Sequence, residues 1–296
     1  MQKIFPESKV DVVIPTYKPG KELVCLLRLL LKQKHEINKI IIINTVQDNR
    51  KFPEFDKYID EKVEKYDIPF NEFNHGLTRN YGISLSDSEY VVFMTQDAVP
   101  ANDMLITELL KPFTDKDVYV TYARQLPKKN CKYVERYVRS FNYPSYDMVK
   151  TKEDFDRIGI KTIFCSDVCA AYRRRGHREL GGFPKADFNE DMIFAYKAVM
   201  AGKKVYYASK AMVKHSHNYT YIEQFKRNVQ IGKSQKTFDF VFGNLKSEDE
   251  GIKMIKNVTC HLIQSGKWYL IPDLIFSSGF KFIGYRIGKL KKSDSI

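Results

Sequence analysis

The sequence of 296 residues predicts an α/β fold, with a mostly parallel sheet flanked by helices and a helical extension at its carboxyl end. Three observations support this prediction. A strand, a helix and a second strand follow one another within about 35 residues, which is the pattern of a βαβ unit with parallel strands. Apolar residues make up 43% of the chain, which is enough for a full core. From Tyr221 onward the pattern is helical and rich in Lys, Tyr and Phe.

The first βαβ unit lies between residues 10 and 43. Val10–Ile14 is a short apolar strand that stops at Pro15, and leucines at helical spacing follow between residues 23 and 31. The run 39–43 contains four consecutive isoleucines, a composition typical of a strand buried on both faces. Two such strands predict the centre of a parallel sheet.

The later elements follow the same patterns, except that residues 128–162 are mixed, charged and aromatic and predict a less regular insertion. We expect helices over 76–86 and 190–200, and strands over 89–93, 118–123, 163–171 and 205–208. The most economical division is one α/β domain over residues 1–220 and a helical extension over 221–296.

Composition narrows the functional classes. A net charge of +13 is explained by a nucleic-acid partner, by an anionic membrane surface, by phosphorylated substrates or by a solvated basic surface without a partner. Five cysteines, an odd number without C-x-x-C spacing, indicate reduced thiols and a cytosolic environment. The first residues lack the apolar stretch of a signal peptide, and no run of about 18 apolar residues predicts a membrane-spanning helix.

Polar side chains gather where the predicted strands end. Asp97 follows the strand 89–93, and open α/β sheets bind ligands at the carboxyl ends of their strands. The loops Pro15-Thr16-Tyr17 and Asn44–Asp48 leave two neighbouring strands toward the same crevice. No G-x-G-x-x-G or Walker sequence is present, so a dinucleotide site and a P-loop have little support.

Two later motifs add acidic and imidazole groups to Asp97. Glu190 and Asp191 begin a predicted helix, and His215 and His217 are two residues apart, so both can face the same side of an extended segment. Together they suggest a site for a metal ion and a general base. The structural alternatives are a turn capped by Asp97 and a helix capped by its first acidic residues.

Five motifs follow one another in the chain: Val12-Val13-Ile14-Pro15-Thr16-Tyr17, His75-Gly76-Leu77-Thr78-Arg79-Asn80, Thr95-Gln96-Asp97-Ala98, Asn189-Glu190-Asp191 and His215-Ser216-His217. In this order they resemble the motifs of family 2 glycosyltransferases of the GT-A fold, over residues 9 to about 235. The Thr95-Gln96-Asp97-Ala98 form resembles the branch of bacterial rhamnosyltransferases.

This resemblance implies a nucleotide-sugar donor site. The implied donor-binding residues are Pro15, Thr16, Tyr17, Asn44, Asp48, Arg79, Gln96 and Asp97, with Arg79 meeting the phosphates. Asp97, with His217 or His215, would hold Mn²⁺ or Mg²⁺; the family's usual Asp-x-Asp is reduced here to a single carboxylate. Imidazole ligands favour Mn²⁺ over Mg²⁺.

The resemblance also implies the chemistry. Asp191 is the expected general base, which takes the proton of the acceptor hydroxyl in one inverting displacement. Glu190 and Asp167 are expected to contact the acceptor. All of these residues precede residue 220.

The function implied is transfer of L-rhamnose from dTDP-L-rhamnose to a lipid-linked saccharide during synthesis of a cell-surface polysaccharide. The alternatives are a UDP-hexose donor on the same fold, and a basic nucleic-acid-binding protein. The latter explains the charge but leaves Asp97, Asp191 and His217 unused, so we expect no nucleic-acid partner.

The extension suggests a location. Its aromatic residues between 276 and 292 suit a helix lying in an anionic membrane interface, although packing on the catalytic domain is nearly as well supported. We expect a cytoplasmic protein, peripheral at the inner face of the plasma membrane. The interleaved basic residues are Lys281, Arg286, Lys289, Lys291 and Lys292.

Overall fold

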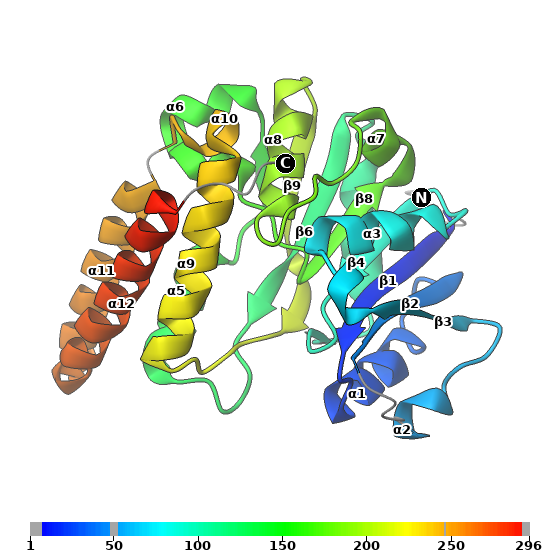
Figure 1. The fold of residues 1–296 in the computed structure, drawn as a ribbon, viewed down its shortest axis with the longest axis horizontal. Coiled ribbons are helices and arrows are strands. Elements are labelled where there is room, and N and C mark those ends of the chain that lie inside the picture. The colour runs from blue at the N-terminus through cyan, green and yellow to red at the C-terminus, as the bar shows by residue number, and fades with distance from the viewer. Residues whose placement is uncertain (1–7, 48–52, 246, 292–296) are drawn as a thin grey trace, which may run out of the picture.

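The computed structural model describes residues 8–47, 53–245 and 247–291, and it places one curled sheet beside a layer of helices (Figure 1). Strands β1 to β3 lie at one end of the molecule, and helices α9, α11 and α12 lie together at the other end (Figure 1). The strands β6 and β9 lie between these two parts (Figure 1). The predicted combination of an α/β sheet and a helical carboxyl end is confirmed.

The sheet has the strand order β3-β2-β1-β4-β8-β6-β9-β5, and β7 pairs with β9. Six strands run in one direction, and β5, β7 and β8 run against them. The strands are β1 Val10–Tyr17, β2 Lys39–Val46, β3 Val63–Pro69, β4 Tyr90–Met94, β5 Val99–Pro100, β6 Val118–Leu126, β7 Met148–Lys150, β8 Cys169–Arg173 and β9 Lys204–Lys214.

Helices cover both faces of the sheet because the central strands are apolar on both sides. Val12 of β1 packs in a core with the leucines of α1 and α4, whereas Val13 packs in a second core with α3 and α8. The helices are α1 Lys21–Leu30, α2 Pro53–Asp56, α3 His75–Ser84, α4 Leu105–Leu110, α5 Tyr133–Asn142, α6 Phe155–Ile158, α7 Arg174–Glu179, α8 Glu190–Met200, α9 Tyr221–Thr237, α10 Asp239–Phe242, α11 Ser247–Gln264 and α12 Ile271–Leu290.

Three sequence-based assignments need correction. Strand β3 was not anticipated, because its alternating charged residues gave no continuous apolar run. The strand expected at 163–171 begins only at Cys169, and Ile163 instead ends a 3₁₀ turn. The expected irregular insertion at 128–162 contains α5 and β7. For β3, β7 and β8, pairing with a strand elsewhere in the sheet decides the bounds.

The carboxyl-terminal helices are packed against the rest of the protein. Val258, Leu262 and Leu274 form a small core of α11 and α12, and apolar side chains of α5 pack against it. In the described part of the chain, no helix combines the length and the apolar character needed to cross a membrane.

Candidate active site

A cavity of about 540 Å³ opens at the carboxyl ends of β4, β6 and β9. Its sheet-side wall includes Asp97, and the amino-terminal end of α8 contributes Asp191. Further wall residues come from α3, α5, α9 and α12 and from the segments 164–168 and 187–189. The expectation that the site lies wholly before residue 220 is therefore wrong, since Gln224, Arg227, Asn228, Ile231 and Lys281 also line the cavity.

Asp97, His215 and His217 converge on one point of this cavity. The Oδ2 atom of Asp97 lies 3.4 Å from Nε2 of His215 and 3.3 Å from Nε2 of His217. The two imidazole Nε2 atoms are 3.0 Å apart. One carboxylate and two imidazoles all place a ligand atom within 4.8 Å of one another, a donor set that suits a divalent cation with mixed oxygen and nitrogen ligands.

Gln125 of β6 sets the orientation of His215. Its Oε1 atom accepts a hydrogen bond from Nη1 of Arg139 at 2.7 Å and lies 3.0 Å from Nδ1 of His215. Because a guanidinium only donates, the atom facing Arg139 must be the amide oxygen, so Nδ1 of His215 carries the proton. The lone pair of Nε2 then points at the cluster, as in metal-binding histidines. Sequence reasoning missed Gln125, which no motif marks.

The protonation states agree with ligand roles. Burial lowers the pKa of His217 to about 4, so its imidazole is neutral at neutral pH. Burial alone would raise the pKa of Asp97, but His215, His217 and Lys128 lower it, and the carboxylate is ionised. Nζ of Lys128 lies 3.6 Å from Asp97 and 2.7 Å from Glu22.

Asp191 has the surroundings of a general base. It follows Asn189, whose left-handed backbone (φ 65°) turns the chain into α8. Its carboxylate accepts hydrogen bonds from the backbone N–H of Asp167 at 3.1 Å and of Met192 at 2.8 Å. Burial and the neighbouring Glu190 raise the pKa of Asp191 to about 7, which suits proton transfer near neutral pH.

Arg79 lines the cavity but is buried and paired with two acids, so we revise its expected contact with donor phosphates. The side chain is 4% exposed and lies 3.1 Å from Asp167 and 3.0 Å from Glu190. Gly76 brings α3 close enough for this contact, since a Cβ there would lie 1.9 Å from the Pro184 carbonyl oxygen. The carboxylates of Asp167 and Glu190, expected to meet the acceptor, are likewise committed to Arg79. Burial raises the pKa of both acids.

The expected nucleoside residues gather beside the cavity, at the ends of β1 and β2. Thr16 Oγ1 donates to Asn44 Oδ1 at 3.2 Å, and Pro15 precedes it on the same strand. The Gln96 side chain makes two hydrogen bonds of 3.0 Å to the Tyr17 backbone, so it joins this loop to the loop of Asp97. Asp48 lies outside the described residues.

Two further residues at this end were missed from sequence because β3 was missed. Asp67 accepts a hydrogen bond of 2.7 Å from the Asn44 amide. The ring of Phe70 lies 5.5 Å from that of Tyr17. The sequence of Val63–Pro69 gives only a weak strand signal, because Glu64, Lys65 and Asp67 interrupt its apolar residues; the pairing of β3 with β2 places Asp67 opposite Asn44.

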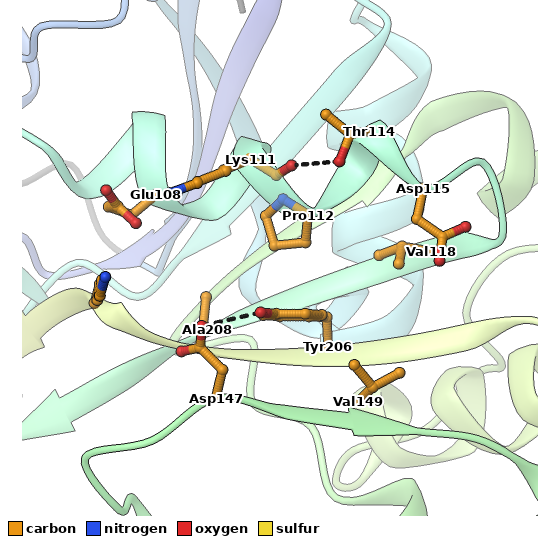
Figure 2. Close-up of a pocket in the computed structure, with 11 residues that line it drawn as sticks. Glu108, Lys111, Pro112, Thr114, Asp115, Val118, Asp147, Val149, Tyr206 and Ala208 are labelled. Atoms are coloured by element: carbon orange, nitrogen blue, oxygen red, sulfur yellow. Dashed lines mark hydrogen bonds between the residues drawn. The ribbon is translucent and has the colours of Figure 1, made fainter. Parts of the chain in front are cut away.

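A second hollow, of about 290 Å³, shares no lining residue with this cavity. Its lining residues are drawn in Figure 2. Figure 2 shows its polar groups bonded to one another: Tyr206 donates to Asp147 at 2.9 Å, and Thr114 donates to the Lys111 carbonyl at 3.1 Å. Asp115, on its rim, pairs with Lys204 at 2.8 Å. Because these groups are satisfied internally, the larger cavity is the candidate active site.

The family model described as Glycosyl transferase family 2 matches residues 11–181, more than half of the chain. The protein therefore belongs to this family and is a glycosyltransferase. It is 34% identical to the O-antigen chain rhamnosyltransferase RfbN of Salmonella typhimurium, over 95% of this chain and 90% of the relative. It is also 34% identical to the O-antigen chain rhamnosyltransferase WbaN of Salmonella anatum, over 94% and 88%.

Solved structures share the fold at low sequence identity. The mannosyltransferase PcManGT of Pyrobaculum calidifontis, solved with GDP-Man and Mn²⁺, gives a TM-score of 0.60 at 13% identity, over 92% of this chain and 75% of that one. Residues 1–349 of S. aureus TarS give 0.56 at 17% identity, over 95% and 90%. These likenesses agree with the predicted GT-A fold.

Proposed function

We propose that the protein transfers L-rhamnose from dTDP-L-rhamnose to a hydroxyl group of a lipid-linked saccharide, in the synthesis of a cell-surface polysaccharide. The sugar is argued from the two relatives named as rhamnosyltransferases, each matched over most of its length. The observation that carries the proposal is the convergence of Asp97, His215 and His217 in the same cavity as Asp191. A leaving-group site and a base then lie within one cavity.

The reaction is a single displacement. The acceptor hydroxyl oxygen forms a bond to the anomeric carbon while the bond from that carbon to the donor diphosphate breaks, which inverts the configuration. Asp191 accepts the proton of the hydroxyl group, and dTDP leaves with the electron pair of the broken bond. A divalent cation, when bound, offsets the negative charge of the diphosphate. Asp97, His215 and His217 would hold Mn²⁺ in preference to Mg²⁺ because two of the three ligands are imidazoles.

The buried cluster of Arg79, Asp167 and Glu190 positions the base. Asp167 donates its backbone N–H to Asp191, and its side chain is fixed by Arg79 and by the Tyr172 hydroxyl at 2.7 Å. Besides burial, repulsion from Glu190 raises the pKa of Asp191. We assign these residues to orientation and pKa rather than to contact with the acceptor.

The nucleoside is proposed to lie at the ends of β1, β2 and β3. Tyr17 and Phe70 offer aromatic surfaces for a base, and Asn44 and Asp67 offer polar partners. Asp67 is thereby added to the donor-binding residues expected from sequence.

We further propose that α11 and α12 rest on an anionic membrane surface, where a lipid-linked acceptor is found. The helices carry exposed basic side chains such as Lys253, Lys256 and Arg286. Near an anionic surface, each such side chain contributes about 1 kcal/mol to the free energy of membrane binding. The apolar residues more than half exposed on these helices and the turn between them are Ile252, Ile263, Trp268, Tyr269, Ile275, Phe276, Phe282, Ile283 and Leu290.

Flotation with vesicles containing anionic lipid tests this surface. The double variant Phe282→Ser, Ile283→Ser should lose most of its binding to the vesicles, and a higher salt concentration should weaken vesicle binding by the wild-type protein. Phe240→Ser, which is 67% exposed on α10, serves as the control and should bind normally. Equal binding by all three proteins would end the membrane proposal.

A thermal-shift screen tests the donor. We expect dTDP-L-rhamnose with Mn²⁺ to raise the melting temperature most, since a ligand that binds only the folded state stabilises it. Product mass after incubation with lipid-linked saccharides then shows the added deoxyhexose. A larger shift with a UDP-hexose would assign the donor to that sugar, and steep salt-dependent DNA binding without any nucleotide-sugar shift would refute an enzyme.

A further inference from the structure

The cavity has one wall made by the carboxyl-terminal helices. Helix α9 contributes Gln224, Arg227 and Asn228, and α12 contributes Lys281. From the sequence, Lys281 was grouped with the basic residues expected to face a membrane. In the structure its side chain lines the cavity instead, where it can contact a substrate.

Helix α12 reaches this position because its backbone touches that of α9. A Cβ on Gly284 would lie 2.5 Å from the Phe225 carbonyl oxygen, and a Cβ on Gly288 would lie 2.2 Å from the Val229 carbonyl oxygen. Ser277 also donates to the Gln224 side chain at 2.8 Å. Lys281 lies between these anchors on the same helix, so its approach to the cavity is part of the packing.

The ammonium group of Lys281 makes no hydrogen bond and no ion pair with any residue in the described ranges. Its acidic neighbours have other partners: Glu135 pairs with Arg139 at 3.0 Å, and Asp273 accepts a hydrogen bond from Tyr221. Burial lowers the pKa of Lys281. A partly buried ammonium without a partner costs free energy, which an anionic ligand would recover.

Arg227 adds a second cation to this wall. Its guanidinium lies over the rings of Phe188 and Tyr219, at 5.2 and 5.8 Å from their centres, and forms no ion pair within the described residues. The proposed metal ligands lie instead on the sheet side of the cavity: Asp97 follows β4, and His215 and His217 follow β9. The cavity therefore has candidate partners for anionic groups on both its sheet side and its helix side.

We propose that Lys281 binds the phosphate of a lipid-linked acceptor, while the sheet side of the cavity takes the donor diphosphate. This inference rests on the proposed function. Helix α12 supports it by joining the two parts such an acceptor needs: Lys281 faces the cavity, and Phe282 and Ile283, next to it in sequence, are each 54% exposed. A lipid phosphate would lie at the ammonium and its chain along the outer face.

Calorimetric titration of the full chain with octyl diphosphate tests the subsite. Saturating dTDP and Mn²⁺ keep the donor side occupied. Lys281→Met should weaken octyl diphosphate binding about tenfold or more, as expected for loss of a charge-assisted hydrogen bond, and Lys281→Arg should restore most of it. Lys32→Met removes the same charge from an exposed site just after α1, away from the cavity and from α11 and α12, and should bind like the wild type.

Each other outcome would overturn the assignment. Unchanged binding by Lys281→Met removes the subsite, and an equal loss of dTDP affinity assigns the ammonium to the donor. Equal binding of octyl glucoside means that the alkyl chain drives association. Equal binding of inorganic pyrophosphate means a site for free phosphate. Because no transfer is measured, these results stand even if the protein proves not to transfer rhamnose, which the product assay decides separately.

Discussion

Replacing Asp191 by Asn tests the assignment of the general base. An amide cannot accept the acceptor proton, and general base catalysis contributes about 10²- to 10⁴-fold. We expect kcat to fall by that factor, which corresponds to about 3 to 5 kcal/mol of activation free energy. The affinity for the donor should stay within a few-fold, because Asp191 is not one of the three converging metal-ligand candidates.

The effect of this substitution on folding follows from the hydrogen bonds of Asp191. Its two carboxylate oxygens accept from the backbone N–H groups of Asp167 and Met192. Asn offers one oxygen, so one N–H loses its partner, at a cost of about 1–3 kcal/mol. The neutral amide also removes the repulsion between Asp191 and Glu190, which offsets part of this cost. The variant should therefore remain folded, with a modest fall in melting temperature.

The pH dependence gives an independent measurement. The pKa of Asp191 is raised to about 7, and only the ionised form is a base. Wild-type kcat should therefore be full above pH 7 and fall about tenfold per pH unit below it, and this limb should be absent from the residual activity of Asp191→Asn.

Steady-state transfer rates over pH 5 to 9, with donor binding measured in parallel, provide the assay. Asp187→Asn is the matched control: it makes the same chemical change at another acid on the cavity wall, and its kcat should stay within a few-fold of wild type. Turnover by Asp191→Asn near the wild-type level, or an unchanged acidic limb, would refute the assignment.

Three further changes address the metal, the buried charges and the helix packing. EDTA should abolish transfer and Asp97→Asn should weaken donor binding and kcat together; a chelator-resistant rate would mean that no cation acts here. Arg79→Met leaves two buried acids unpaired and should lower the free energy of unfolding in urea by about 3–5 kcal/mol, whereas Arg175→Met, which breaks an exposed pair, should change it little; similar losses for the two variants would refute this. Gly288→Ala places a Cβ 2.2 Å from an α9 carbonyl oxygen and should lower the free energy of unfolding by about 1–3 kcal/mol. Gly279→Ala, where the space around the new Cβ is open, should leave the free energy of unfolding unchanged or raise it. If Gly288→Ala left it unchanged, the two helices would not be held by this close contact.

The sequence alone predicted the sheet, the family and the chemical groups of the site. Continuous apolar runs mark strands buried on both faces, and parallel strands bring their carboxyl ends to one edge. For that reason the strand pattern by itself places Asp97 near Thr16 and Asn44. Side chains two residues apart in an extended segment point to the same side, so the sequence predicted that the imidazoles of His215 and His217 face the same way.

Tertiary structure decided which of these groups can act. Arg79 looked like a phosphate ligand because it follows a turn, but helix packing buries it against Asp167 and Glu190. Lys281 looked like a surface residue because aromatic and basic residues alternate around it, but glycine contacts between α9 and α12 turn it into the cavity. Local sequence determines a residue's chemistry and its element. Contacts between segments far apart in the chain determine its solvent exposure, its pKa and its partners.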